Sequence, residues 1–123
     1  MRLFKTRRFA KWARKEGVSD LALRRLVSEL ESGLLGVSLG GPLFKKRLPL
    51  RSHGKSRGAR TILAYKIREK AFFIFGFNKS VSSNISQEEL SALKKLAKQL
   101  CEYTECELSD ALDARDIEEI NDA

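Results

Sequence analysis

The residues best suited to chemistry lie in one short stretch, Arg51-Ser-His-Gly-Lys-Ser-Arg-Gly-Ala-Arg60. It contains four cations, two glycines and the only histidine of the 123-residue chain. Glycine lets a backbone approach a ligand closely, and arginine and lysine supply positive charge, so the stretch suits binding to a polyphosphate backbone. A solvated surface loop that is merely basic is the alternative interpretation.

The distribution of charge along the chain favours a polyanionic partner. The net charge is +8, but residues 1–80 carry 20 Lys and Arg against 5 Asp and Glu, and residues 81–123 carry 4 against 11. The first part therefore has a charge of +15 and the second a charge of −7. A region with so much positive charge is expected to bind a polyanion, most simply nucleic acid.

Length and composition predict one domain over residues 1–123, with residues 102–123 as an acidic, weakly helical C-terminal tail. No apolar run reaches the ~20 residues that cross a bilayer, and none follows the basic N-terminus, so we expect a cytoplasmic protein with no membrane partner. Cys101 and Cys106, with one distant histidine, do not make a zinc set. Two reduced thiols and no metal are expected.

The N-terminal third predicts a short strand over Arg2–Lys5 and then two helices. Thr6 and Ser19 are placed to cap the helices at their N-termini, and Gly17 is placed to end the first one. Apolar residues recur at helical spacing behind each cap: Phe9, Trp12 and Ala13 in the first helix, and Leu23, Leu26, Val27 and Leu30 in the second.

The middle of the chain predicts an antiparallel sheet. Val37–Pro42 contains a turn at Gly40-Gly41-Pro42, and strands are expected over Leu43–Leu48, Thr61–Ile67 and Ala71–Phe77. The last of these is apolar on both faces and is expected at the centre, with Phe73, Phe75 and Phe77 all pointing one way. Lys45, Lys46 and Arg47 put charge on both faces of their strand, so one face of the sheet must be open.

The C-terminal part predicts a helix that begins after Ser86, where Glu89 completes a capping box. Leu108–Ile120 reads as a weak acidic helix or an ordered tail. The fold class is therefore α+β, a small antiparallel sheet on which two N-terminal helices and a C-terminal helix pack.

This order of elements, together with two motifs, resembles the RelE/ParE superfamily of bacterial toxins, and within it the HigB-like RelE branch. The motifs are Gly54-Lys-Ser-Arg-Gly-Ala-Arg-Thr61 and Ala71-Phe-Phe-Ile-Phe-Gly-Phe-Asn-Lys-Ser80. The resemblance implies the RelE-like toxin fold, with helices on one side of the sheet. It also implies a type II toxin, which enters the ribosome and cuts mRNA there. Its partner would be a small antitoxin, often of helix-turn-helix type.

Under this resemblance, cleavage proceeds by attack of the substrate's own 2′-OH on the neighbouring phosphate, without metal or other cofactor. Arg60 corresponds to the family's arginine at the start of a strand, and Lys79 to the basic residue after the last strand. Both would stabilise charge on the phosphate. Five further cations are candidates for RNA binding: Lys46, Arg47, Arg51, Lys55 and Arg57.

His53 is a candidate for proton transfer, because imidazole titrates near neutral pH. Some RelE-type toxins use a tyrosine near the C-terminal helix, but Asn84-Ile-Ser86 occupies that region here. Tyr65 reads as a packed residue on a strand, and Tyr103 lies in the acidic end. The general base therefore stays unassigned.

Three functions remain open at this point. The chain is a ribosome-dependent mRNA endonuclease, a ParE-like toxin that inhibits DNA gyrase by binding, or a basic nucleic-acid-binding module without catalysis. The superfamily fold permits the first two, because fold alone does not dictate function.

Overall fold

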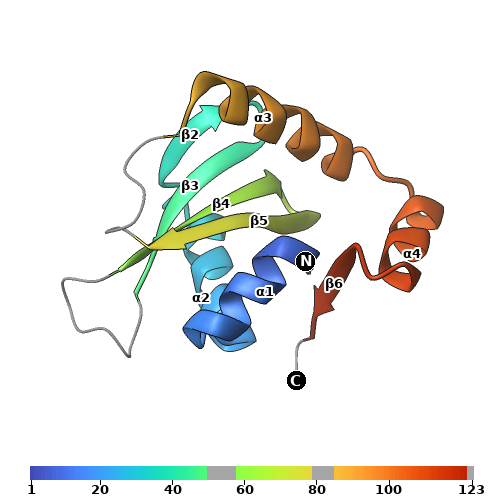
Figure 1. Cartoon of the computed structure of the whole chain (residues 1–123), viewed down its shortest axis with the longest axis horizontal. Helices are drawn as coiled ribbons and strands as arrows, with labels where there is room; N and C mark the ends of the chain where they lie inside the picture. Colours follow the sequence, from blue (N-terminus) through green and yellow to red (C-terminus); the bar gives the residue numbers. More distant parts are fainter. Residues whose placement is uncertain (50–57, 79–84, 122–123) are drawn as a thin grey trace.

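The computed structural model describes residues 1–49, 58–78 and 85–121, which form a six-stranded sheet between two layers of helix (Figure 1). The strand order is β2-β3-β4-β5-β1-β6. Helices α1 and α2 pack on one face, and α3 and α4 on the other. The expectation that all helices lie on one side was wrong, because the apolar β4 and β5 have two faces to bury.

The centre of the sheet is the antiparallel set β3 (Leu43–Leu48), β4 (Ala59–Lys66) and β5 (Lys70–Asn78). These bounds confirm the three predicted strands to within two residues. β5 lies between β4 and β1, as its apolar pattern predicted.

The sheet is not wholly antiparallel, which corrects the sequence prediction. β1 (Arg2–Thr6) runs parallel to β5, with Leu3 opposite Ala71 and Phe4 opposite Phe72. Parallel neighbours need a long crossover, and here the crossover holds both N-terminal helices and three strands. Local sequence pattern carries no information about this pairing.

Both N-terminal helices begin where the caps predicted, and the first ends where Gly17 predicted. α1 (Arg7–Glu16) starts after Thr6, whose side chain accepts a hydrogen bond from the Phe9 N–H, and ends at Gly17 with φ of 73°. α2 (Asp20–Glu31) starts after Ser19. Their apolar faces fill one core with the adjacent side of the sheet.

The turn predicted at Gly40-Gly41-Pro42 is confirmed, and a strand that the sequence did not predict precedes it. Val37–Gly40 forms strand β2, which pairs with β3 at the edge of the sheet. The chain turns only at Gly40 and Gly41, which have φ values of 109° and 54°. A four-residue strand with a half-exposed apolar pattern gives little signal of its own.

The C-terminal region is more ordered than the sequence predicted. α3 (Gln87–Cys101) starts at the Ser86/Glu89 capping box, as expected. A second capping box, Thr104/Glu107, starts α4 (Glu105–Asp113). Strand β6 (Ile117–Ile120) then pairs antiparallel with β1 at the edge of the sheet, so the predicted acidic tail is a helix followed by a strand.

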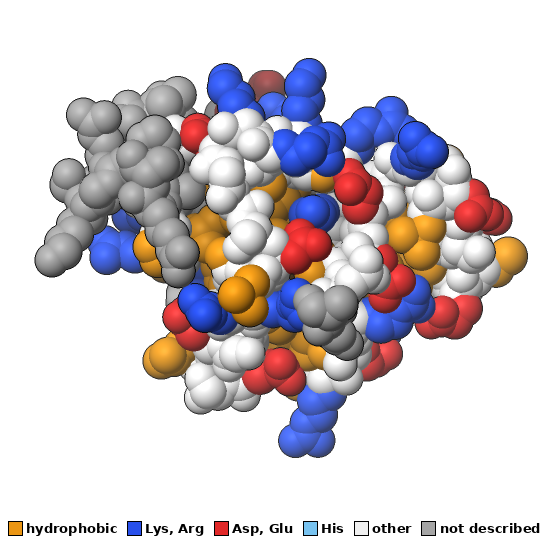
Figure 2. Space-filling model, turned by 90° about the horizontal axis from the view of Figure 1, so that it is seen from below, with side chains coloured by type: hydrophobic (Ala, Val, Ile, Leu, Met, Phe, Trp, Pro, Cys, Tyr) orange, Lys and Arg blue, Asp and Glu red, His pale blue; other side chains and the backbone are white. Residues whose placement is uncertain are grey.

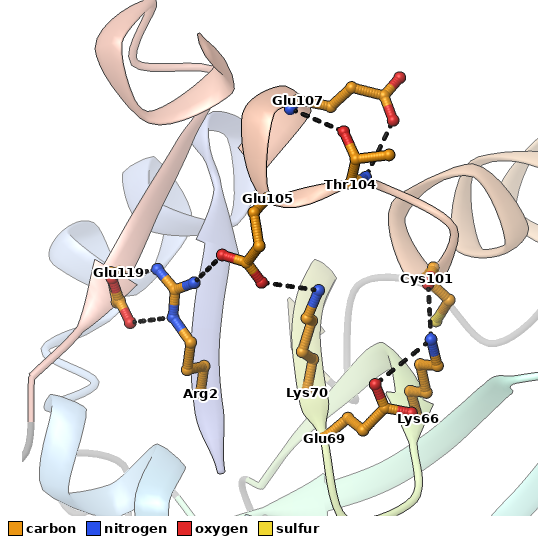
Figure 3. Close-up of polar contacts among 9 residues, drawn as sticks. All are labelled: Arg2, Lys66, Glu69, Lys70, Cys101, Thr104, Glu105, Glu107 and Glu119. Carbon is orange, nitrogen blue, oxygen red and sulfur yellow. Dashed lines mark hydrogen bonds and ion pairs between the residues drawn. The ribbon is translucent and has the colours of Figure 1, made fainter. Parts of the chain in front are cut away.

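Acidic side chains of this C-terminal segment neutralise cations at the β1 edge (Figure 3). Arg2 donates to Glu119 at 2.9 Å and to Glu105 at 3.0 Å, and Lys70 lies 3.8 Å from the same Glu105 carboxylate. Two further pairs join α1 to the segment, Arg7–Asp116 and Arg14–Glu118. The acidic end therefore closes an edge of the sheet.

The Arg2–Glu119 pair makes a pH-dependent contribution to stability. Hydrogen bonds from Arg2 hold the pKa of Glu119 below its ordinary value of 4.5. A carboxyl with a lowered pKa stabilises the fold at pH values above its unfolded pKa, and this contribution is lost as the pH falls through the folded pKa. We expect Glu119→Gln to lower the unfolding temperature by a few degrees at pH 7 and by much less at pH 3.

Thermal unfolding at both pH values measures this difference, which is worth at most about 1 kcal/mol because both side chains are partly exposed. Asp110→Asn, an exposed position in α4, is the matched control. An equal loss at pH 7 and pH 3 would contradict an ionic role for Glu119.

Candidate nucleic-acid interface

Strand alternation gathers basic side chains at one end of the sheet, on the α3 side. Leu43 of β3 packs in the core under α3, whereas Leu48 packs in the core under α1 and α2. Side chains alternate along a strand, so Lys45 and Arg47 share the face of Leu43. On β4, Arg60 shares the face of Ile62, which also belongs to the α3 core.

Arg47, Arg60 and Phe77 form a row across three neighbouring strands. Arg47 is the register partner of Arg60, which is in turn the partner of Phe77. Arg47 is exposed, and the other two are half-buried. Two like charges directly opposite each other weaken a sheet, so this arrangement is costly unless an anion joins them.

A register shift in β4 and β5 decides which phenylalanines join this row. Ile62 is paired with Phe75 but Leu63 with Phe73, so one residue of β5 is extra at this point. Phe73 consequently packs with Phe9 of α1, and Phe75 and Phe77 lie on the α3 side. The prediction that all three rings point the same way was wrong.

The cations of this face have no acidic partner within residues 1–49, 58–78 and 85–121. None of Lys45, Arg47 and Arg60 takes part in an ion pair there, and the only hydrogen bond of Arg60 is to the Ala59 carbonyl at 3.5 Å. By contrast, Arg2, Arg7 and Arg14 are all paired with acids. The charges of Lys45, Arg47 and Arg60 are therefore available to bind an external anion.

Lys46 lies on the opposite face of β3 and is 8% exposed. Its Nζ contacts the Glu29 carboxylate of α2 at 2.7 Å and donates to the Leu34 carbonyl at 2.9 Å. The structure therefore does not bring Lys46 together with Arg60. Its predicted RNA-binding role stays a prediction, and its position gives it a structural role.

The α1/α2 side of the molecule has a mixed surface. Figure 2 shows Lys and Arg side chains there with Asp and Glu interspersed. A hollow of about 470 Å³ between α2 and the end of β3 is lined by apolar residues and by charges of both signs, among them Arg25 and Glu29. Arg25 on this side also has no ion pair among the described residues, so the other face differs in having two such arginines, Arg47 and Arg60, as cross-strand partners.

Five predicted site residues fall outside the described parts of the chain: Arg51, His53, Lys55, Arg57 and Lys79. They belong to the segment that joins β3 to β4 and to the segment after β5. Their roles stay predictions.

The two tyrosines do not join Arg60. Tyr65 is buried under α1 and α2, where burial raises the pKa of its hydroxyl, so it is packed as the sequence predicted. Tyr103 packs against the core beside α3 and α4. Among the residues described, no group of three His, Cys, Asp or Glu side chains could hold a metal ion.

Cys101 and Cys106 are not joined by a disulfide in the structure. Cys101 is buried, which raises its pKa, and Cys106 is exposed.

Sequence reasoning missed Arg8. Its guanidinium carbon lies 4.7 Å from the centre of the Phe75 ring, on the same side of the sheet as Arg60. Arg8 is the second residue of α1, just after β1, so only knowledge that β1 runs parallel to β5 would have placed it beside Phe75.

The order of elements and the mixed sheet define a small α+β protein with the RelE-like toxin fold that the sequence predicted. A family model described as RelE toxin of RelE / RelB toxin-antitoxin system matches residues 1–120. The chain therefore belongs to this family of toxins, and its place in the HigB-like branch stays a prediction. No curated protein matches the sequence. In the described ranges, no helix is both long and apolar enough to cross a membrane.

The Lys46–Glu29 pair generates a stability prediction. Glu29→Ala leaves a buried ammonium group with one neutral acceptor, so we expect it to cost about 1–3 kcal/mol of unfolding free energy. Lys46→Met keeps the packed stem without the charge and should cost less. Urea unfolding measures both, and Glu31→Ala on the same helix is the control.

Glu29→Ala should also become harmless once Lys46 is methionine. If the double variant is as unstable as the sum of the two single variants, the pair does not act as a unit.

Proposed function

We propose that this toxin is a ribosome-dependent endoribonuclease that inhibits translation by cutting mRNA. The observation that carries the proposal is the Arg47–Arg60 pair, two arginines at cross-strand partner positions without acidic partners in the described chain. Membership of the RelE family supports the toxin part of the proposal.

The proposed chemistry is an internal displacement on the RNA phosphate. The 2′ oxygen attacks phosphorus, the bond to the 5′ oxygen of the next nucleotide breaks, and a 2′,3′-cyclic phosphate remains. The proton lost by the 2′-OH must be taken up, and the departing 5′ oxygen must receive one. Negative charge grows on the non-bridging oxygens between these events, and a fixed cation stabilises it.

Arg60 is the residue to which we assign this charge stabilisation. Its strand is held on both sides by β3 and β5, so the start of its side chain is fixed in place. A guanidinium group can donate two parallel hydrogen bonds to phosphate. Lys79 would act on the same phosphate, and His53 is the candidate for moving a proton.

Arg47 is assigned to RNA binding, next to the scissile phosphate. Arg51, Lys55 and Arg57 lie in the segment that joins β3 to β4. Arg47 lies near the end of β3, just before this segment, and Arg60 lies near the start of β4, just after it. They would extend the contact along the RNA backbone or to ribosomal RNA. The cognate antitoxin, of proposed helix-turn-helix type, would be the inhibitory partner in the cytoplasm.

The test is to induce the protein in cells and to map mRNA 5′ ends in translating and in translation-blocked cells. New 5′ ends within coding regions, present only during translation, are expected. Arg60→Ala should lower the cleavage rate by about 10²–10³-fold, the typical effect of losing one charge-stabilising donor. Arg25→Ala on α2, which removes the same charge from the opposite face, is the control.

Two outcomes would overturn the endonuclease proposal. Intact transcripts during growth arrest, together with inhibition of DNA supercoiling by the purified protein, would identify a gyrase inhibitor. A protein that never cuts RNA, whose RNA affinity falls with rising salt concentration and is weakened by Arg60→Ala, would be a binding module.

A further inference from the structure

Two phenylalanine rings of β5 reach the surface beside Arg60. Four phenylalanines lie on this strand, and Phe72 and Phe73 are 0% exposed. Phe75 and Phe77 are half-buried, and their ring centres lie 5.8 Å apart with an angle of 34° between the ring planes. They form a tilted aromatic pair on the same face as Arg60.

The strand register places this aromatic pair next to Arg60. Phe77 is the cross-strand partner of Arg60, so it is the immediate neighbour of the proposed phosphate contact. Phe75 lies two residues before Phe77 on the same strand, opposite Ile62 of β4. Cation and ring thus stand side by side, as phosphate and base do along a nucleic-acid strand.

Arg8 completes the group from a different element. The Thr6 side chain donates to the Ile74 carbonyl at 3.0 Å, which fixes the junction of β1 and α1 against β5. Arg8, two residues later, lies over the Phe75 ring at 4.7 Å. Its neighbour Arg7 is paired with Asp116, whereas Arg8 has no acidic partner among the described residues.

We infer that Arg8, Phe75 and Phe77 form a stacking platform for one or two unpaired nucleobases of single-stranded RNA, adjacent to the phosphate held by Arg60. Aromatic side chains that alternate with cations are the usual means of binding single strands, because every base has a flat face. The guanidinium group of Arg8 is planar and can stack on a base or on a ring. The inference rests on the proposed RNA substrate.

The platform gives the site a preference for unpaired RNA. A duplex presents its bases to each other and hides their faces, whereas an opened strand can lay a base on Phe77 while its phosphate contacts Arg60. Binding should therefore depend on the presence of the bases as well as on the backbone charge.

The test is to measure binding of short, fully 2′-O-methylated RNA, which cannot be cut by 2′-OH attack, and of the same oligonucleotide with abasic sites. Phe77→Leu should weaken binding of the base-bearing strand by about 5- to 150-fold, the range for one lost stacking contact. It should leave binding of the abasic strand unchanged. Phe44→Leu, a partly buried ring on the opposite face, is the control.

Arg8 is tested in the same assay. Arg8→Ala should weaken binding of the base-bearing strand, and Lys11→Ala, an exposed cation on the same helix, should not. An equal effect of the two variants would mean that Arg8 contributes charge alone and would overturn its place in the platform.

A measurement on the unaltered protein guards against variants that fold poorly. Photo-cross-linking with RNA that contains 5-iodouridine should join the base to Phe75 or Phe77, as mapped by mass spectrometry. Cross-links confined to other elements, or equal loss of base-bearing and abasic binding in Phe77→Leu, would overturn the platform while leaving the endonuclease proposal intact. Base-dependent binding without any cleavage in cells would support the platform and overturn the endonuclease proposal.

Discussion

The parallel pairing of β1 with β5 is the constraint on which the rest of this structure depends. It inserts the start of the chain into the sheet beside β5, whose first five residues are all buried. It directs α1 across one face, where Phe9 meets Phe73 and where Gly76 leaves room for the Trp12 ring. It also gives β6 an edge to pair with, so the two ends of the described chain are neighbours.

The division of side chains between the two faces follows from the strands themselves. β3 and β4 alternate regularly, and this regularity alone separates buried Lys46 from exposed Arg47. β5 contains one extra residue opposite Ile62 and Leu63, and its aromatic side chains change faces there. Without that shift, Phe75 and Phe77 would face α1, and the arginines would have no aromatic neighbours. A bulge of this kind re-aims side chains at the end of a sheet.

Much of the fold could be predicted from the sequence, because it rests on local rules. Caps at Thr6, Ser19 and Ser86 fixed the starts of three helices, and apolar runs fixed three strands to within two residues. The parallel partner of β1, the edge strand β6 and the bulge in β5 depend on contacts between distant residues, and no local pattern encodes them. For the same reason, Arg60 could be proposed from its motif, but Arg8 could not.

The ion pairs at the β1 edge also shape the electric field of the molecule. Arg2, Arg7, Arg14 and Lys70 are each matched there by a carboxylate, so that edge contributes little to the net charge of +8. Lys45, Arg47 and Arg60, on the other half of the sheet, have no such carboxylate partner among the described residues. The positive charge that carboxylates leave unmatched therefore lies away from the β1 edge, and a polyanion at a distance is attracted least toward that edge.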